Sequence, residues 1–174
     1  PAMSRLLIVL SMFALTLALS ACESPDEETE TKAPVVMVAP KAPAGSDDKE
    51  WKMYLQAVVS QNMAGVTDRV FPYYLPANST VPTPGDTQNR SQFDRQLENV
   101  TSVLSRTVLP GNMLVFGSPD SAKMADLVIS AFSGGKPDAL KGSQVLFIGK
   151  AEDNAGVKVA VQDVGAKYIF VEAK

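Results

Sequence analysis

Three short runs of consecutive apolar residues in the second half of the chain constrain the fold most strongly. They occupy residues 113–116 (MLVF), 145–148 (VLFI) and 168–171 (YIFV). A strand with one solvated face alternates apolar and polar residues, whereas a continuous apolar run of this length is typical of a strand buried on both faces. Strands of this kind belong to parallel sheets covered by helices. The runs therefore predict a parallel sheet in an α/β domain.

The segment after the first run has the pattern of a helix. Ser118 is a suitable N-cap, Pro119 a suitable first helical residue, and Asp120 is favourable in a first turn. Gly134 marks the end of the helix. The apolar residues expected on its buried face are Met124, Leu127, Val128, Ala131 and Phe132.

Residues 151–164, between the second and third runs, fit two patterns. Positions 157, 160, 161 and 164 form one apolar face of a helix, whereas positions 157, 159 and 161 alternate as in a strand. Glu152 and Asp153 suit a first helical turn, and Gly165 suits the position after a helix. These end signals favour the helix.

The resulting fold prediction is a small three-layer α/β domain. A short parallel sheet with β-α-β-α-β order spans residues 113–172, and two helices precede it, at about 49–63 and 90–107. If residues 151–164 form a strand instead, the domain is α+β with a C-terminal hairpin.

An aromatic segment lies between the two upstream helices. Residues 70–76 (VFPYYLP) hold two prolines, which disfavour a helix, and a polar loop follows at 77–89. Tyrosine offers a large contact area at a low entropy cost. Tyr73 and Tyr74 are therefore candidates for binding a partner. The alternative is a strand at the edge of the core, with both tyrosines half-buried.

The N-terminal sequence has the pattern of a secretory signal. Arg5 precedes an apolar run at 6–19, which is shorter than the about 20 residues of a membrane-spanning helix. The tetrapeptide at 19–22 (LSAC) then resembles the lipobox of bacterial lipoproteins. The resemblance implies that residues 1–21 are a cleaved signal peptide and that Cys22 is acylated.

The residues after Cys22 are expected to form a spacer. Residues 23–50 hold eight acidic and three basic side chains with many prolines and alanines, a composition that favours disorder. Residues 51–174 hold eleven acidic and twelve basic side chains and form the predicted globular domain. Glu23 stands where lipoproteins kept in the inner membrane usually carry aspartate. We therefore expect the outer membrane, with the domain facing the periplasm.

Composition excludes several classes of catalyst. The chain has no histidine, and Cys22 is its one cysteine, so Ser–His–Asp and Cys–His catalysis and zinc sites with histidine are excluded. No glycine-rich dinucleotide or phosphate loop and no calcium loop are present. We expect no cofactor and no metal, and the near-neutral domain has no basic block that would bind nucleic acid.

Ligands of parallel sheets bind beyond the carboxyl ends of the strands. The expected edge carries Gly117, Ser118, Asp120 and Ser121 after the first strand, and Gly149 and Lys150 after the second. Lys150 beside a helix N-terminus could hold a phosphate or carboxylate. The alternative is that Ser118 and Asp120 only cap a helix, and that Lys150 is a solvated lysine.

These features favour a non-enzymatic function. The leading hypothesis is a lipid-anchored module that faces the periplasm and binds another envelope protein, as inhibitor and immunity lipoproteins do. A second hypothesis is a domain that binds a small anionic or nucleotide-related ligand at the Gly117 and Gly149 edge. A third is a carboxylate-dependent hydrolase of the cell envelope that uses Asp120 and Asp153.

Overall fold

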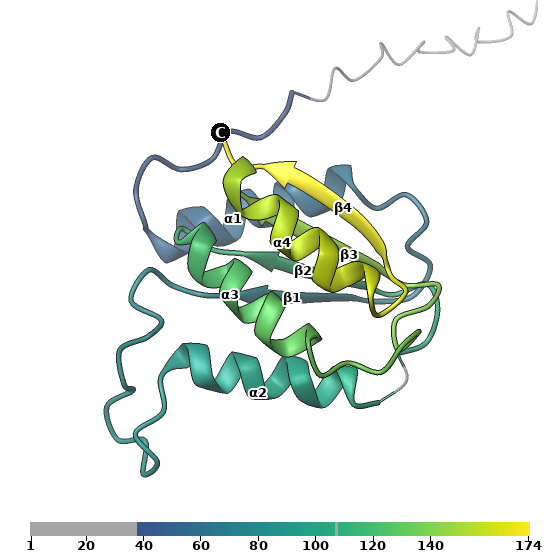
Figure 1. Cartoon of the computed structure of the whole chain (residues 1–174). Coiled ribbons are helices and arrows are strands. Elements are labelled where there is room, and N and C mark those ends of the chain that lie inside the picture. Colours follow the sequence, from purple (N-terminus) through teal and green to yellow (C-terminus); the bar gives the residue numbers. More distant parts are fainter. Residues whose placement is uncertain (1–37, 107) are drawn as a thin grey trace, which may run out of the picture. The chain divides into compact units, whose positions relative to one another are not determined.

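The computed structural model describes residues 38–106 and 108–174, which form a three-layer α/β domain (Figure 1). The predicted signal peptide, Cys22 and the first part of the predicted spacer lie outside the described residues. Helices and strands alternate along the chain in this order: α1 (Asp48–Gln61), β1 (Val70–Tyr74), α2 (Gln92–Leu104), β2 (Met113–Gly117), α3 (Ser121–Phe132), β3 (Gln144–Gly149), α4 (Ala151–Gln162) and β4 (Lys167–Glu172).

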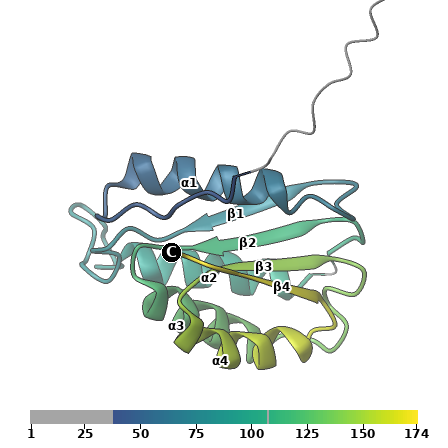
Figure 2. The same cartoon turned by 90° about the horizontal axis from the view of Figure 1, so that it is seen from above.

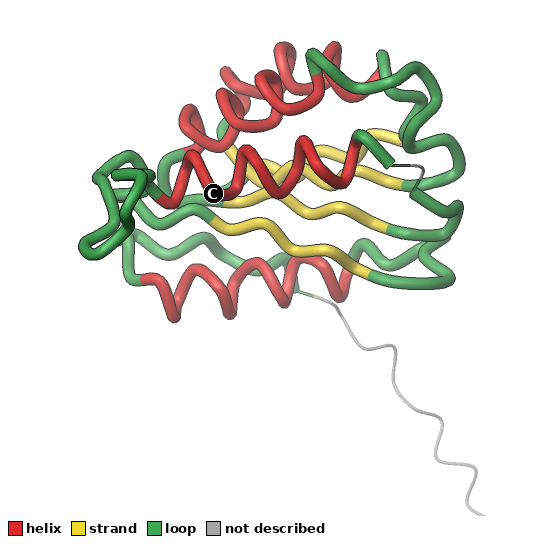
Figure 3. The backbone as a smooth tube through the Cα atoms, turned by 90° about the horizontal axis from the view of Figure 1, so that it is seen from below, coloured by secondary structure: helices red, strands yellow, loops and turns green. Residues whose placement is uncertain are grey.

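The four strands form one parallel sheet in the order β1-β2-β3-β4. Each crossover moves the chain one strand further in the same direction. Because crossovers between parallel strands are right-handed, the three connecting helices α2, α3 and α4 lie on the same face. Helix α1 precedes the first strand and covers the opposite face (Figure 2, Figure 3).

The strands alternate between two separate cores. Leu114, Phe116 and Phe147 pack under α2, α3 and α4, whereas Val115 and Ile148 pack under α1. Every residue of β2 and β3 is buried. Burial on both faces explains why the central strands have continuous apolar sequences.

The predicted β-α-β-α-β order is confirmed, and residues 151–162 are helical rather than part of a hairpin. The aromatic segment forms the edge strand β1, which confirms the strand alternative for it. Pro72 obscures it, because a proline interrupts the ladder of a central strand. Here Pro72 lies exposed in an edge strand, where proline is tolerated.

The N-cap predicted for α3 is wrong by two residues. Asp120 is the N-cap, and its Oδ1 accepts the Lys123 backbone N–H at 3.1 Å. The Ser118 hydroxyl instead accepts the Asp120 N–H at 3.0 Å within the preceding turn. At α1 the N-cap is Asp47, whose Oδ1 accepts the Glu50 N–H at 2.9 Å.

Part of the predicted spacer contacts the domain. We call residues 38–46 the strap, because they run beside α1 and past the end of β4. The Gln61 amide donates to the Val38 carbonyl at 3.0 Å, the Ala42 N–H donates to the Lys174 carbonyl at 2.7 Å, and the Trp51 indole donates to the Gly45 carbonyl at 2.7 Å. The folded unit therefore begins before residue 51.

The connection from β1 to α2 is organised by one carboxylate, that of Asp86. Its Oδ1 accepts the backbone N–H groups of Gln88 and Arg90 at 2.9 and 3.2 Å, and its Oδ2 accepts a guanidinium N–H of Arg90 at 3.3 Å. These hydrogen bonds, first those from the Arg90 and Gln88 backbone and then those from the guanidinium, hold the pKa of Asp86 below its ordinary value.

The lowered pKa of Asp86 predicts a loss of stability in acid. In the unfolded chain this carboxyl titrates at about pH 4. Its stabilising contribution is therefore present above that pH and is lost as pH falls through the lower pKa of the folded state. Asp86→Asn should flatten the fall of the melting temperature below about pH 4. Asp126→Asn, at an exposed ion pair with Lys123, is the control and should leave the acid limb unchanged. If the melting temperatures of Asp86→Asn and the wild type fell equally below about pH 4, the assignment to Asp86 would be contradicted.

Candidate functional site

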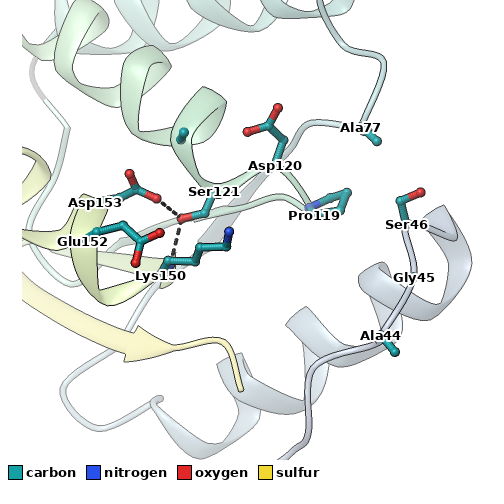
Figure 4. Close-up of a pocket in the computed structure, with 11 residues that line it drawn as sticks. Ala44, Gly45, Ser46, Ala77, Pro119, Asp120, Ser121, Lys150, Glu152 and Asp153 are labelled. Atoms are coloured by element: carbon teal, nitrogen blue, oxygen red, sulfur yellow. Dashed lines mark hydrogen bonds between the residues drawn. The ribbon is translucent and has the colours of Figure 1, made fainter.

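The carboxyl ends of β2 and β3 form one side of a cleft, and the strap forms the other (Figure 4). Its first part is a cavity of ≈530 Å³ and its second an adjoining hollow of ≈340 Å³. Pro119, Ser121 and Lys150 line both parts, together with Ala44 and Gly45 of the strap. We call this site the edge cleft. Its total size falls in the about 300–1,000 Å³ range of small-molecule sites.

Ser121 links the two turns that form the floor of the edge cleft. Its buried hydroxyl donates to Asp153 Oδ2 at 2.6 Å and accepts the Lys150 backbone N–H at 2.7 Å (Figure 4). Gly149 lies directly below, where an added Cβ would come 2.5 Å from Ser121 Oγ and 2.8 Å from the Phe147 ring. Glycine is therefore required at 149 for the two turns to approach this closely.

Two other residues predicted for the site have mainly structural contacts. Gly117 packs against the Leu55 side chain of α1, so that an added Cβ would collide with it. Ser118 is 1% exposed, lines the smaller hollow and accepts the Asp120 N–H. Its hydroxyl proton has no acceptor within residues 38–106 and 108–174. The predicted edge residues thus come together, but Gly117 serves the packing of α1.

The edge cleft has opposite charges in its two parts. The larger cavity is lined by Asp120, Glu152 and Asp153 against Lys150, an excess of negative charge. The smaller hollow is lined by Lys41, Lys150 and Lys174 and by no carboxylate side chain. An anion is therefore disfavoured in the larger cavity. Lys41 belongs to the strap, and the sequence analysis missed it because the strap has the composition of a linker.

Asp120 and Asp153, the pair of the hydrolase hypothesis, line the same cavity (Figure 4). One oxygen of each carboxylate accepts a hydrogen bond within the fold: Asp120 Oδ1 accepts the Lys123 backbone N–H, and Asp153 Oδ2 accepts the Ser121 hydroxyl. Among the described residues, no group of three or more acidic, histidine or cysteine side chains is placed to hold a metal ion.

The structure separates the two predicted partner-binding tyrosines. Tyr73 is 8% exposed and stacks on Phe116 in the core, with ring centroids 4.9 Å apart, so its prediction as a surface contact is wrong. Alternation along the strand places Tyr74 on the α1 side, half-buried, where its hydroxyl donates to Asp48 Oδ1 at 2.7 Å. Burial, and then the Asp48 carboxylate, raise the pKa of Tyr74.

The two edges of the sheet differ in a way that the sequence analysis did not consider. On β1 the outward-facing backbone is blunted, because Pro72 has no N–H and the Gln96 amide donates to the Tyr74 carbonyl at 3.3 Å. On β4 no described residue bonds to the outward-facing groups of Tyr168, Phe170 and Glu172. The sequence signal is the absence of proline from β4 and its presence in β1.

Comparison of the chain with protein-family models, with curated proteins and with solved structures finds no match. No helix within the described part of the chain is both long enough and apolar enough to cross a bilayer. The site is therefore assessed from its own geometry.

Ser121 gives a direct test of how the edge cleft is held together. Ser121→Ala leaves the buried Lys150 N–H and the Asp153 carboxylate without their partner, which should cost about 1–3 kcal/mol of unfolding free energy. Ser133→Ala is the matched control, since its exposed hydroxyl only bonds the Ser130 carbonyl one turn away. Urea unfolding of both variants measures the difference. Equal, small effects would show that Ser121 does not join the two turns.

Proposed function

We propose that this chain is a lipid-anchored protein of the bacterial envelope that binds another protein by strand addition at β4. The proposal rests above all on one observation, that no described residue pairs with the outward-facing backbone groups of β4. An exposed sheet edge with unpaired backbone groups is a template for an added strand. A non-enzymatic module of the inhibitor or immunity type is one form that such binding would take.

Backbone hydrogen bonding supports the availability of the β4 edge. The N–H of Lys167 donates to the Ser143 carbonyl, and that of Ala173 donates to the Gly149 carbonyl, so odd-numbered residues of β4 face β3. Because successive residues of a strand alternate in direction, the N–H and C=O groups of Tyr168, Phe170 and Glu172 point away from the sheet.

The apolar side chains of β4 are partly exposed on both faces of the sheet. Tyr168 and Phe170 lean on the α4 side, where the Tyr168 hydroxyl donates to Asn154 at 2.9 Å. Ile169 and Val171 lie on the α1 side, and all four residues are half-buried. An incoming strand would bury more of this surface, at roughly 25 cal/mol per Å² of apolar area.

The lipobox-like sequence at residues 19–22 supports an envelope location for this binding site. Several acyl chains on one residue would anchor the chain permanently, because each buried CH₂ contributes about 0.8 kcal/mol. The acidic residues after Cys22 would hold the domain away from the membrane as a spacer. We place the protein at the outer membrane, facing the periplasm, with an envelope protein as its partner.

The β4 proposal is tested by a proline at an outward-facing position. Glu172→Pro removes an N–H that the fold does not use and sets a proline ring against any added strand. Capture of an envelope protein by the full, acylated chain should fall at least about tenfold, the effect of losing one or two buried hydrogen bonds. Glu172→Ala is the matched control, because both changes remove the exposed Glu172–Lys174 ion pair. Equal capture by the two variants would overturn strand addition.

The anchor is tested separately. Cys22→Ala should abolish incorporation of radiolabelled palmitate and move the chain from the membrane fraction to the soluble fraction, because no acyl chain could then form on the protein. Ser60→Ala, at an exposed position on α1, is the control and should leave palmitate incorporation and membrane pelleting unchanged. Continued membrane pelleting and labelling of Cys22→Ala would contradict lipidation at this residue.

A further inference from the structure

The edge cleft holds charges that do not neutralise each other. Lys41, Lys150, Asp120, Glu152 and Asp153 line it, and none of them forms an ion pair within the described residues. Elsewhere in the described chain, neighbouring opposite charges do pair, as in Arg90–Glu98 at 3.1 Å and Lys123–Asp126 at 3.2 Å. Positive and negative groups thus line one cleft without pairing, and Figure 4 shows Lys150, Glu152 and Asp153 among them.

We infer that the edge cleft binds a small zwitterion such as a dipeptide, with its carboxylate in the lysine-lined hollow and its ammonium in the acidic cavity. This site lies at the strand ends and is separate from the β4 edge, so it goes beyond the proposed function. A ligand with both charges compensates both parts of the cleft, whereas a simple anion would meet Asp120 and Asp153 in the larger cavity.

The lysine-lined hollow has one further donor for a carboxylate. Helix α4 does not supply it, because the first-turn residues Glu152 and Asp153 line the larger cavity and only the N-cap residue Lys150 lines the hollow. The buried Ser118 hydroxyl lines the same hollow with a free proton. Lys174 also lines it but is paired with Glu172 at 2.7 Å, so Lys41 and Lys150 are the available cations.

The charges of the two parts do not pair with each other. No ammonium nitrogen in the cleft lies within 4.0 Å of a carboxylate oxygen other than that of Glu172. An extended dipeptide carries its ammonium and its carboxylate about 7 Å apart, whereas a free α-amino acid carries both on one carbon. The dipeptide is therefore the zwitterion with which the cleft is tested.

The experiment is calorimetric titration of the full chain with L-Ala-L-Ala as the probe. Its N-acetylated and C-amidated analogues each lack one charge, and inorganic phosphate tests the anion alone. The dipeptide should bind, and each capped analogue should bind at least about tenfold more weakly, because one charge-assisted hydrogen-bonded group is lost. Phosphate should not bind measurably. Equal binding of dipeptide and capped analogues, tighter binding of phosphate, or no dipeptide binding at millimolar concentration would overturn the inference.

Variants assign the two ends of the ligand. Lys150→Ala should remove the preference for the free carboxylate over the amide, and Asp120→Asn the preference for the free amine over the acetylated form. Both side chains can be changed without opening the core, because Lys150 is exposed and asparagine keeps the acceptor for Lys123. Lys158→Ala, exposed on α4 and outside the cleft, is the control. Glu172→Pro should retain dipeptide binding, so failure at β4 and failure at the cleft are distinguishable.

Discussion

Burial of both faces of the β2–β3 pair is the constraint on which the rest of this structure depends. All five residues of β2 and all six residues of β3 are buried, so the sheet must be covered on each side. The right-handed crossovers place α2, α3 and α4 on one face, which leaves the other face to α1. Gly117 lets α1 approach closely, since any side chain there would displace Leu55. Polar chemistry is thereby restricted to the strand ends and to the outer strands.

Strand order decides what can be built at those ends. In doubly wound sheets, ligands bind where the order reverses and neighbouring connections part to opposite faces. The order β1-β2-β3-β4 has no reversal, so the connections alone do not open a crevice. The strap supplies the missing wall, tied down by its Ala42 and Gly45 hydrogen bonds. The cleft and the β4 edge are consequently two surfaces with different chemistry, one a charged hollow and the other an apolar strand edge.

Residues whose environment is set by neighbours in sequence were the ones predicted well. The three apolar runs became β2, β3 and β4, and Glu152 and Asp153 lie at the helix start expected for them. Two predictions failed, one because of a distant segment and one for a local reason. Tyr73 was expected at a surface, but its register opposite Phe116 buries it. Ser118 was expected to cap α3, but Asp120 reaches the Lys123 N–H and takes that place.

The sequence by itself determined that this chain has a parallel sheet with helical crossovers, because apolar periodicity and helix end signals act over a few residues. It also holds the pattern from which acylation at Cys22 is expected. Only the tertiary structure decided that β1 joins the sheet, that one sheet edge is blunted and the other open, and that the strap closes the edge cleft. Those features depend on contacts between segments far apart in the chain, such as Ala42 with Lys174 and Ser121 with Asp153, which no local pattern encodes.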